Sequence, residues 1–352
     1  DRIQEILDLM EEARLDYFLI SDPQSIAYCT GYYNDPHERM FVFMVSKHGN
    51  HTLFMNDLFY LEHDLDVNIV WHKDGQDAIQ TIVDEMHFPG RIGIDKNWAS
   101  HFLLDLMKKL PDAKYINASP CVDLVRMKKD LQEQVLMIES SKINDAVMEE
   151  IIPFIQEGVT EKQLAKKLDE LFFNHHSTCY GAIVAFGKNA ADPHHENDDT
   201  PLRKGDCVLI DMGCVYKGYC SDMTRTFFYE GILEEEIKVY EIVKKANEAA
   251  EAMIKPGVKL SDIDKCARKV ISDEGYGKYF THRLGHFIGR DVHEYGDVSS
   301  VNEMEVEEGM IFSIEPGIYL EGNFGVRVED LVMVTKDGCQ VLNSFTKDIY
   351  II

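Results

Sequence analysis

The sequence predicts two domains, an α/β domain at the N-terminus followed by an α+β domain. A chain of 352 residues is too long for one core of ordinary size. Strand and helix patterns alternate up to residue 110, whereas pairs of long helices precede groups of strands in the remainder. A segment rich in turn-forming residues at 111–123 separates the two patterns, and we place the boundary between residues 119 and 120.

The N-terminal domain, residues 1–119, is expected to be an α/β layer structure. Its first element is an amphipathic helix at 2–13, identified by an apolar stripe of helical period. Short apolar runs predict strands, and longer amphipathic stretches predict two more helices. The expected strands are 16–20, 40–46, 51–55, 67–72 and 91–95, and the expected helices are 75–87 and 98–110.

The C-terminal domain, residues 120–352, is expected to repeat one arrangement of helices and strands. Thr160, with Gln163 three residues later, has the pattern of a helix cap, and Ser261 is expected to cap a later helix. The expected helices are 130–156, 160–174, 233–254 and 260–274, and the expected strands are 182–187, the segments around residues 211–226, 309–320, 324–335 and 338–342. Because a helix pair precedes strands twice, we expect two similar halves.

Composition excludes several classes of protein. A net charge of −26 argues against nucleic acid as a partner, because phosphate binding needs a basic surface. The sequence contains no run of 18 apolar residues, so no membrane span is expected. The N-terminus also lacks the layout of a signal peptide. Eight scattered cysteines without a CxxC pair indicate reduced thiols in a cytoplasmic protein, with a Cys214–Cys220 disulfide as the alternative.

The stretch "DMGCVYKGYCSDMTRT" at 211–226 predicts a β-hairpin that presents two carboxylates. A two-residue turn at Lys217-Gly218 would pair residue 211 with 224, which places Asp211 and Asp222 on one face. Their backbones would then be roughly 7–8 Å apart. Two carboxylates this close repel each other and are costly to bury without partners, so either the face is solvated or cations lie between them. The apolar flanking residues argue against a solvated face.

Further carboxylates and histidines favour the cation interpretation. "SIEPG" places Glu315 before a Pro-Gly turn, and "GVRVEDLVMVT" places Glu329 in an apolar strand. "THRLGHFIGRDVHE" at 281–294 supplies three histidines within twelve residues. Four carboxylates and one imidazole suit a pair of Mn²⁺ ions, or Co²⁺ or Zn²⁺. The predicted chemistry is hydrolysis by a hydroxide that bridges two metal ions about 3.5–4 Å apart.

The order and context of these motifs resemble the metallopeptidase family with the pita-bread fold, family M24. That family includes prolidases, aminopeptidase P and methionine aminopeptidases. The motifs cover residues 180–335, and the N-terminal domain resembles the creatinase and prolidase type of the prolidase and aminopeptidase P branch. The resemblance implies an α/β domain followed by a pita-bread catalytic domain, two divalent ions per subunit with Mn²⁺ first, a small peptide substrate and a homodimer.

The resemblance also assigns roles to residues by motif. It makes Asp211, Asp222, His286, Glu315 and Glu329 the metal ligands, with Asp222 and Glu329 bridging and Glu315 as proton shuttle. His194, after Pro193, matches the histidine that steadies the scissile carbonyl, and its neighbour His195 receives no role. His293 is assigned to catalysis and to substrate binding. The other residues expected to bind substrate are His282, Arg327 and Arg290.

Departures from the family pattern bear on the substrate. Phe287 stands where a second glycine usually follows the metal histidine, and it is expected either to narrow the pocket or to pack behind it. The leading hypothesis is an Xaa-Pro dipeptidase, or prolidase. The alternatives are an aminopeptidase P that acts on longer peptides and a binding protein without activity. A loop at 32–40, with Asp35, His37 and Arg39, is expected either to be solvated or to reach a neighbouring subunit's active site.

Overall fold

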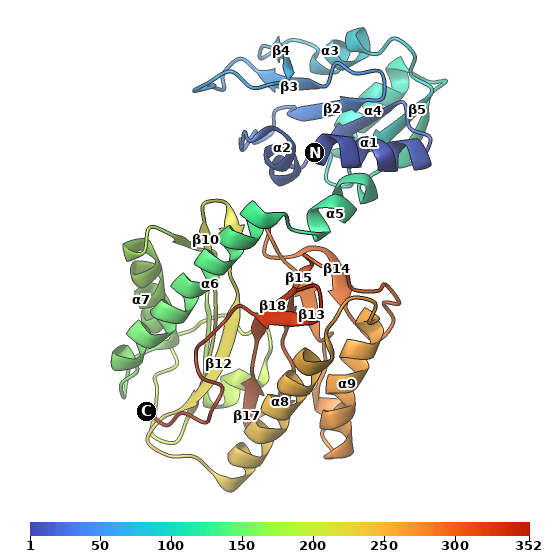
Figure 1. Ribbon diagram of the computed structural model, residues 1–352. Coiled ribbons are helices and arrows are strands. Elements are labelled where there is room, and N and C mark those ends of the chain that lie inside the picture. The colour runs from blue at the N-terminus through green and yellow to red at the C-terminus, as the bar shows by residue number, and fades with distance from the viewer. The chain divides into compact units, whose positions relative to one another are not determined.

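The computed structural model describes all 352 residues, which divide into two compact units, Asp1–Arg126 and Met127–Ile352 (Figure 1). The boundary expected at residue 120 falls at the first residue of helix α5 (Pro120–Met127). Val122 and Val125 of this helix are buried in the core of the first unit. The apolar face of α5 therefore assigns most of this helix to the N-terminal unit.

The first unit is a six-stranded mixed sheet in the order β4-β3-β2-β1-β5-β6. The strands are β1 (Tyr17–Ile20), β2 (Val42–Ser46), β3 (Thr52–Asn56), β4 (Asn68–His72), β5 (Arg91–Ile94) and β6 (Lys114–Asn117). The helices are α1 (Arg2–Glu12), α2 (Pro23–Thr30), α3 (Ala78–Glu85), α4 (Ser100–Lys109) and α5. Side chains of β1 alternate between two apolar cores, since Phe18 packs toward α1 and Leu19 packs toward α3 and α4. Helices on both faces explain why this strand is apolar throughout.

The sequence predictions for this unit hold for eight elements and fail for three. Helices α1, α3 and α4 and strands β1 to β5 are confirmed. Helix α2 was not predicted, although Asp22 caps it through Ser25 N at 2.9 Å and Gly31 ends it in the left-handed conformation, φ 78°. The expectation of a plain connection at 111–123 was wrong, because this stretch forms β6 and the start of α5.

The 32–40 loop uses part of its charge within the first unit. The Arg39 guanidinium donates two hydrogen bonds of 2.9 Å to the carboxylate of Asp74. His37 adopts a positive φ of 51°, and its N–H donates to Asp35 Oδ1 at 3.0 Å. The action of this loop on a neighbouring subunit stays a prediction.

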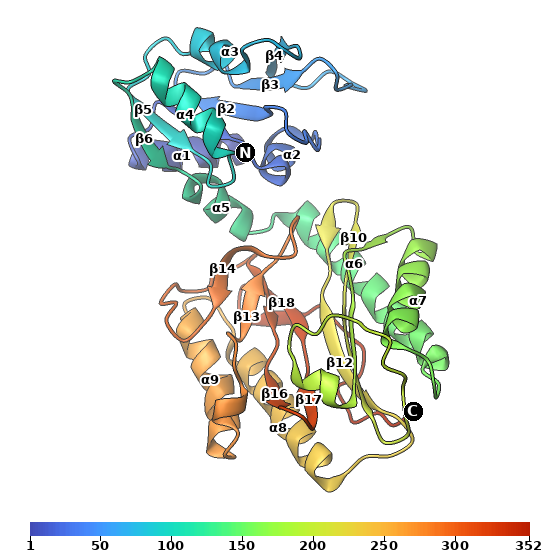
Figure 2. The same ribbon diagram turned by 180° about the vertical axis from the view of Figure 1, so that it is seen from behind.

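The second unit repeats a pair of helices followed by a sheet, as expected (Figures 1 and 2). The helices are α6 (Leu131–Ile151), α7 (Glu161–Asn174), α8 (Glu234–Met253) and α9 (Leu260–Asp273). The strands are β7 (Thr178–Cys179), β8 (Ile183–Phe186), β9 (Cys207–Met212), β10 (Cys214–Tyr216), β11 (Tyr219–Cys220), β12 (Met223–Phe228), β13 (Gly285–Phe287), β14 (Glu294–Val298), β15 (Ile311–Ile314), β16 (Gly317–Leu320), β17 (Phe324–Arg327), β18 (Asp330–Val334) and β19 (Cys339–Val341).

Two main sheets follow the two helix pairs. The first has the order β12-β9-β8 and packs against α7 through β8, and the second has the order β14-β13-β15-β18-β19 and packs against α8 through β15 and β19. Strands β13 and β14 were not predicted. In Figure 1 helices α6 and α8 lie in front of the strands, and in Figure 2 the strands lie in front. The helices therefore cover one side of the strands and leave the other side to the loops.

The predicted hairpin and one predicted cap are confirmed, and a second cap is corrected. Lys217 and Gly218 form the two-residue turn with φ of 48° and 83°, as a type I′ turn requires. Asp211 pairs with Thr224, as predicted. Thr160 and Gln163 form the capping box at the start of α7. Ser261 does not cap α9, because it lies inside the helix and its hydroxyl donates to Glu303 Oε1 at 2.9 Å.

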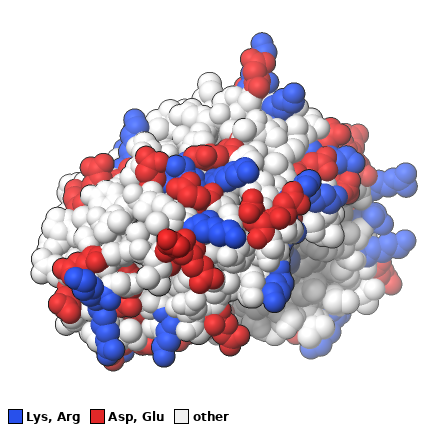
Figure 3. Space-filling model, turned by 90° about the horizontal axis from the view of Figure 1, so that it is seen from below, with Lys and Arg blue, Asp and Glu red and all other residues white.

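The surface charges, the helices and the cysteines bear on the classes of protein that the composition was expected to exclude. On the face shown in Figure 3, lysines and arginines are scattered among aspartates and glutamates. No helix is long and apolar enough to cross a membrane. All eight cysteines are free thiols, so the alternative of a Cys214–Cys220 disulfide is wrong in this structure.

Candidate active site

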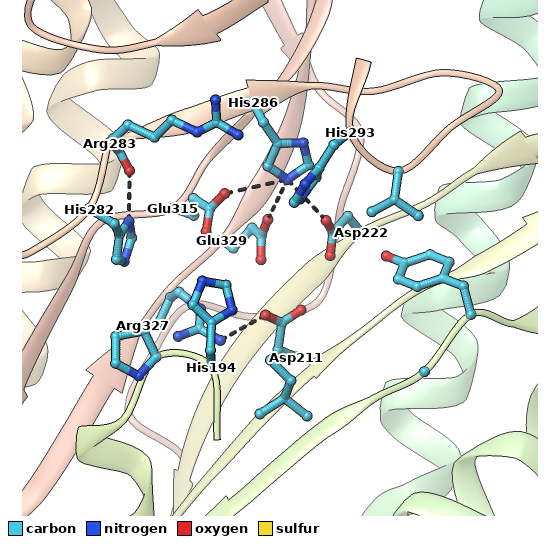
Figure 4. A pocket seen from close by; sticks show the side chains of 15 residues that line it. His194, Asp211, Asp222, His282, Arg283, His286, His293, Glu315, Arg327 and Glu329 are labelled. Atoms are coloured by element: carbon cyan, nitrogen blue, oxygen red, sulfur yellow. Dashed lines mark hydrogen bonds and ion pairs between the residues drawn. The ribbon is translucent and has the colours of Figure 1, made fainter. Parts of the chain in front are cut away.

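Breaks between strands carry three of the predicted metal ligands. Asp222 lies between β11 and β12, Glu315 between β15 and β16, and Glu329 between β17 and β18. Pro316 follows Glu315 and has no N–H to donate to a ladder, which accounts for the end of β15. The single strands expected at 309–320 and 324–335 are therefore each interrupted at the residue that faces the site. Figure 4 shows the three carboxylates pointing into one space.

The other two predicted ligands lie within strands. Asp211 belongs to β9. His286 belongs to β13, where the pairing with β14 shifts between His286 and Phe287. Such a bulge re-aims side chains, and the imidazole of His286 points toward the carboxylates (Figure 4). The structure therefore brings all five predicted ligands to one place.

The imidazole of His286 lies at the centre of this group. Its Nε2 is 3.3 Å from Asp222 Oδ2, 3.4 Å from Glu315 Oε1 and 4.0 Å from Glu329 Oε1. Its Nδ1 lies 3.1 Å from the carbonyl oxygen of Phe287, which accepts a hydrogen bond from Nδ1–H. This bond leaves the lone pair of Nε2 directed at the carboxylates, as in a histidine that binds a metal.

The carboxylates of Asp222 and Glu329 are buried with like charges around them. Burial raises the pKa of Asp222 well above its ordinary value, and the charges of Asp211 and Glu315 raise it further. Burial likewise raises the pKa of Glu329, followed by the charges of Asp222 and Glu315. No lysine or arginine forms an ion pair with Asp222, Glu315 or Glu329. Such an arrangement is costly unless a cation joins it.

The donor set fits divalent ions of hard or borderline character. Ligand atoms of Asp222, His286 and Glu329 lie within 4.8 Å of one another. Carboxylate oxygens and one imidazole nitrogen, without a thiolate, suit Mn²⁺, Co²⁺ or Zn²⁺. Thr224 Oγ1 donates to Glu329 Oε2 at 2.6 Å, and Ser313 Oγ donates to Glu315 Oε1 at 3.0 Å. These hydrogen bonds orient the carboxylates and leave other lone pairs directed at the cavity.

Arg327, which was expected to bind substrate, is buried and already engaged. Its side chain is 2% exposed, and its Nη2 donates to Asp211 Oδ2 at 2.7 Å. Its Nη1 donates to Tyr319 Oη at 3.1 Å, and its Nε donates to Thr224 Oγ1 at 3.2 Å. The guanidinium therefore orients Asp211 from behind and has little freedom to reach a substrate.

A cavity of about 240 Å³ opens in front of these residues. Its lining combines the five predicted ligands with three further histidines, two arginines and several apolar or aromatic residues. These residues are Tyr180, Gly181, Ile183, Pro193, His194, Asp211, Asp222, His282, Arg283, His286, Val292, His293, Glu315, Arg327 and Glu329. Figure 4 shows His194 on the wall opposite His286.

The environments of His282 and His293 differ from that of His194. His282 Nε2 lies 2.7 Å from Tyr319 Oη, and burial lowers its pKa. The ring of His293 lies 4.1 Å from that of His286, and burial, followed by the charges of His286 and Arg283, lowers the pKa of His293 to about 4. His293 is therefore neutral near pH 7. His194 is exposed, and its ring forms no hydrogen bond within the chain.

Two residues singled out by sequence lie outside the cavity lining. The guanidinium of Arg290 lies 5.4 Å from the ring centre of Tyr219, on the hairpin. Phe287 is fully buried and packs on Phe312, which places it behind the pocket and does not narrow it. Sequence reasoning missed Arg283. Its position directly after His282 was the signal that could have found it.

Comparisons with known proteins find similar sequences over both units. The sequence model of metallopeptidase family M24 matches residues 135–336, and that of the creatinase/prolidase N-terminal domain matches residues 2–128. An uncharacterized peptidase of Staphylococcus aureus (strain bovine RF122 / ET3-1) is 34% identical over 98% of this chain and 99% of the relative.

Solved structures of similar proteins cover both units. A dipeptidase from Pyrococcus horikoshii OT3 is 34% identical, with a TM-score of 0.93 and full coverage of both chains. A prolidase from the same organism is 28% identical, with a TM-score of 0.92 and 99% coverage of both chains. An X-Pro aminopeptidase from Thermotoga maritima MSB8 is 28% identical, with a TM-score of 0.86 and coverage of 98% and 100%.

Proposed function

The chain belongs to metallopeptidase family M24, and on this premise we propose that it is an Xaa-Pro dipeptidase that works with two divalent metal ions. The observation that carries the proposal is the convergence of four carboxylates and the imidazole of His286 on the wall of one cavity. The similarity to a dipeptidase and a prolidase over the full chain supports the dipeptide substrate.

The ions would be held by the five convergent residues, Asp211, Asp222, His286, Glu315 and Glu329. Mn²⁺ is proposed first, with Co²⁺ or Zn²⁺ as alternatives, because the donors are oxygen atoms and one imidazole nitrogen. When bound, such ions act as Lewis acids toward a scissile carbonyl and make water nucleophilic near neutral pH. Burial and neighbouring carboxylates raise the pKa values of Asp222 and Glu329, and this cost of holding negative charge supports a cation at the site.

Side chains of this chain would bind the peptide and move its protons. Glu315, whose side chain is 17% exposed, would accept a proton from the attacking water and deliver it to the leaving nitrogen. The nitrogen of an Xaa-Pro bond carries no hydrogen, so it needs this proton to leave as a secondary amine. His194 would donate a hydrogen bond to the carbonyl oxygen as charge develops on it, and neutral His293 would position the peptide beside His286.

We propose that Arg283 binds the free carboxylate of a dipeptide, in place of the Arg290 and Arg327 expected from sequence. Arg283 lines the cavity, its side chain is 41% exposed, and its ion pair with Asp297 is long at 3.6 Å. A guanidinium can exchange such a loose partner for a bidentate carboxylate. A cavity of about 240 Å³ is smaller than most ligand pockets, which range over roughly 300–1,000 Å³, and this favours a short substrate.

One observation favours the alternative, an Xaa-Pro aminopeptidase. A second cavity of about 480 Å³ shares Pro193 with the first and is lined by Lys278, Tyr279 and Tyr319. Residues beyond proline in a longer peptide could occupy it, with Lys278 near the distant carboxylate. The two cavities therefore give the two activities different cations to test.

The test compares Leu-Pro with Leu-Pro-Gly after metal removal and reconstitution with Mn²⁺. We expect leucine release from the dipeptide, and we expect Arg283→Ala to lower its kcat/KM by roughly 10- to 100-fold, the loss of one charge-assisted contact. Lys278→Ala is the matched control and should leave dipeptide hydrolysis unchanged. Preference for the tripeptide, with sensitivity to Lys278→Ala, would establish the aminopeptidase instead.

We also propose that the enzyme works as a homodimer in the cytoplasm. Eight free cysteines suit a reducing compartment. The dimer rests on the family resemblance, and light scattering of the purified protein measures it directly.

A further inference from the structure

We propose that Glu161 is a positioning residue that holds His194 at the cavity. The inference rests on the role of His194 proposed above, and it concerns a carboxylate that lines neither cavity. Glu161 is the first residue of α7 and its side chain is fully buried. A buried carboxylate needs either a cation or several hydrogen-bond donors.

Four donors satisfy the two oxygens of Glu161. Oε1 accepts hydrogen bonds from Phe186 N and from Asn189 Nδ2, both at 2.9 Å. Oε2 accepts from Asp198 N at 3.0 Å and from His195 Nε2 at 2.6 Å. Because the oxygen accepts, Nε2 of His195 carries the proton. A carboxylate offers about four lone-pair positions, so this one is saturated.

Three of these donors belong to the segment between β8 and β9 that carries His194, which we call the loop. Asn189 precedes His194 by five residues, His195 follows it directly, and Asp198 follows it by four. One carboxylate thus fixes the loop before, beside and after His194. The ring of His194 has no hydrogen bond of its own within the chain, so the position of its backbone determines where the ring lies.

The same loop is fixed on its other sides by the strands of the site. The side chain of Asn197 bridges Ala182 O and Val184 N in the β8 region, with both bonds at 2.7 Å. Gly325 of β17 approaches so closely that a Cβ there would lie 1.9 Å from Ala190 O. Loss of the Glu161 anchor should therefore let the middle of the loop move while its contacts with the strands remain. A displacement of about 1 Å at a reacting group can cost on the order of 100-fold in rate.

The start of α7 does not depend on Glu161. Thr160 Oγ1 accepts a hydrogen bond from Gln163 N at 3.2 Å, and Gln163 Oε1 accepts from Thr160 N at 3.0 Å. Gln163→Ala removes part of this capping box without touching the loop. It is therefore a matched control for a substitution at the neighbouring residue.

The first experiment compares Glu161→Gln with Gln163→Ala. The amide nitrogen of the glutamine would face two N–H donors at one of the two oxygen positions, which breaks the anchor with almost no change in volume. We expect kcat for Leu-Pro to fall by roughly 10- to 100-fold with KM and bound Mn²⁺ nearly unchanged, because His194 acts in the transition state. Gln163→Ala should lower thermal stability and leave kcat as in the wild type. Equal kcat in wild type and Glu161→Gln would overturn the proposal.

A double variant tests whether Glu161 acts through His194. Glu161→Gln combined with His194→Ala should be no slower than His194→Ala alone, because the anchored group is already absent. A further 10-fold loss in the double variant would contradict the proposal. His195→Gln, which keeps an N–H donor, should retain most of the activity, whereas His195→Leu should lose part of it.

Hydrogen exchange tests the anchor without any substrate. In Glu161→Gln, the amide hydrogens of Phe186 and Asp198 should exchange faster, while those of α6 and α8 keep their wild-type rates. Unchanged protection at both positions would overturn the proposal whatever the substrate is. A wild-type enzyme that fails to cleave Leu-Pro would instead overturn the proposed function and leave the anchor standing.

Discussion

Two groups of carboxylate and histidine in the second unit look alike by distance and differ in their hydrogen bonds. In both groups, Asp222–His286–Glu329 and Glu161–His195–Asp198, the ligand atoms lie within 4.8 Å of one another. In the second group, Glu161 accepts four hydrogen bonds, three of them from N–H groups other than that of His195. In the first group, the carboxylates face one another and share one imidazole.

The difference shows that proximity of ligand atoms does not by itself identify a metal site. A buried carboxylate that is saturated by donors is stable as it is, and a metal ion would have to displace those donors. Burial, followed by the like charges around them, raises the pKa of Asp222 and of Glu329, and carboxylates that the protein leaves in this state gain most from a cation. We therefore assign the first group to the metal ions and the second to the position of the loop.

The largest expected effect is the contrast between one substitution in each group, Asp222→Asn and Glu161→Gln. Asp222→Asn should lower kcat/KM by at least on the order of 10²–10³-fold, the loss that follows removal of one strong electrostatic stabiliser. In the metal-free protein the same change should raise the midpoint of thermal unfolding, because it removes one of several buried like charges. Glu161→Gln should lower that midpoint. Calorimetry of both metal-free variants decides, and a fall in both would contradict the contrast.

Mn²⁺ should stabilise the folded protein by binding at the first group, Asp222–His286–Glu329, and not at the second. Mn²⁺ at 100 times its dissociation constant should raise the free energy of unfolding by about 2.7 kcal/mol for each ion bound, in the wild type and in Glu161→Gln. Asp222→Asn should show little of this gain. Thermal melts with and without Mn²⁺ measure the effect, and an equal gain in all three proteins would show that the ions bind elsewhere.

The pH dependence of stability should change sign with the metal. The pKa values of Asp222 and Glu329 are raised in the folded state, above the value of about 4 for an exposed carboxyl group. The folded metal-free protein therefore binds more protons than the unfolded chain, so its stability falls as the pH rises from about 5 toward the raised values. With saturating Mn²⁺ the trend should reverse, because the ion competes with protons for the same oxygens. Denaturant titrations at several pH values measure both trends. If the ligand assignment is wrong, the free energy of unfolding will change with pH in the same direction with and without Mn²⁺.

The smallest expected effect concerns Asp198. Its backbone N–H donates to Glu161 Oε2 at 3.0 Å, and its exposed carboxylate accepts from Thr200 N at 2.7 Å. Asp198→Ala should leave bound metal, measured by atomic absorption, and kcat within about twofold of the wild type, as expected of a surface change. A loss of one bound ion per chain would show that the second group also holds metal.

Much of the fold was predictable because local patterns and tertiary packing agree. The turn at Lys217-Gly218 and the cap at Thr160 depend on residues close together in the chain. Helix α2 carried both an Asp22 cap and a terminal Gly31, but its eight residues are too few for a clear apolar period. Ser261 shows the opposite error, because a residue with capping chemistry found its partner in the distant Glu303.

The site was predictable in its composition and less so in its geometry. Motifs supplied all five residues that converge on the cavity, yet no pattern indicates that strands end at Asp222 or Glu329. From the sequence Arg327 was expected to bind substrate, whereas in the structure its guanidinium donates to Asp211, Thr224 and Tyr319, and the first two of these partners are distant in the chain. It gave His195 no role, because the Glu161 that binds it lies 34 residues away.

The most direct measurement is a titration of Mn²⁺ into the metal-free enzyme, with bound metal and leucine release from Leu-Pro followed together. We expect no hydrolysis without metal and saturation of activity at two ions per chain, with the same stoichiometry in Glu161→Gln. Full hydrolysis of Leu-Pro by the metal-free protein, or a stoichiometry that falls in Glu161→Gln and not in Asp222→Asn, would contradict it.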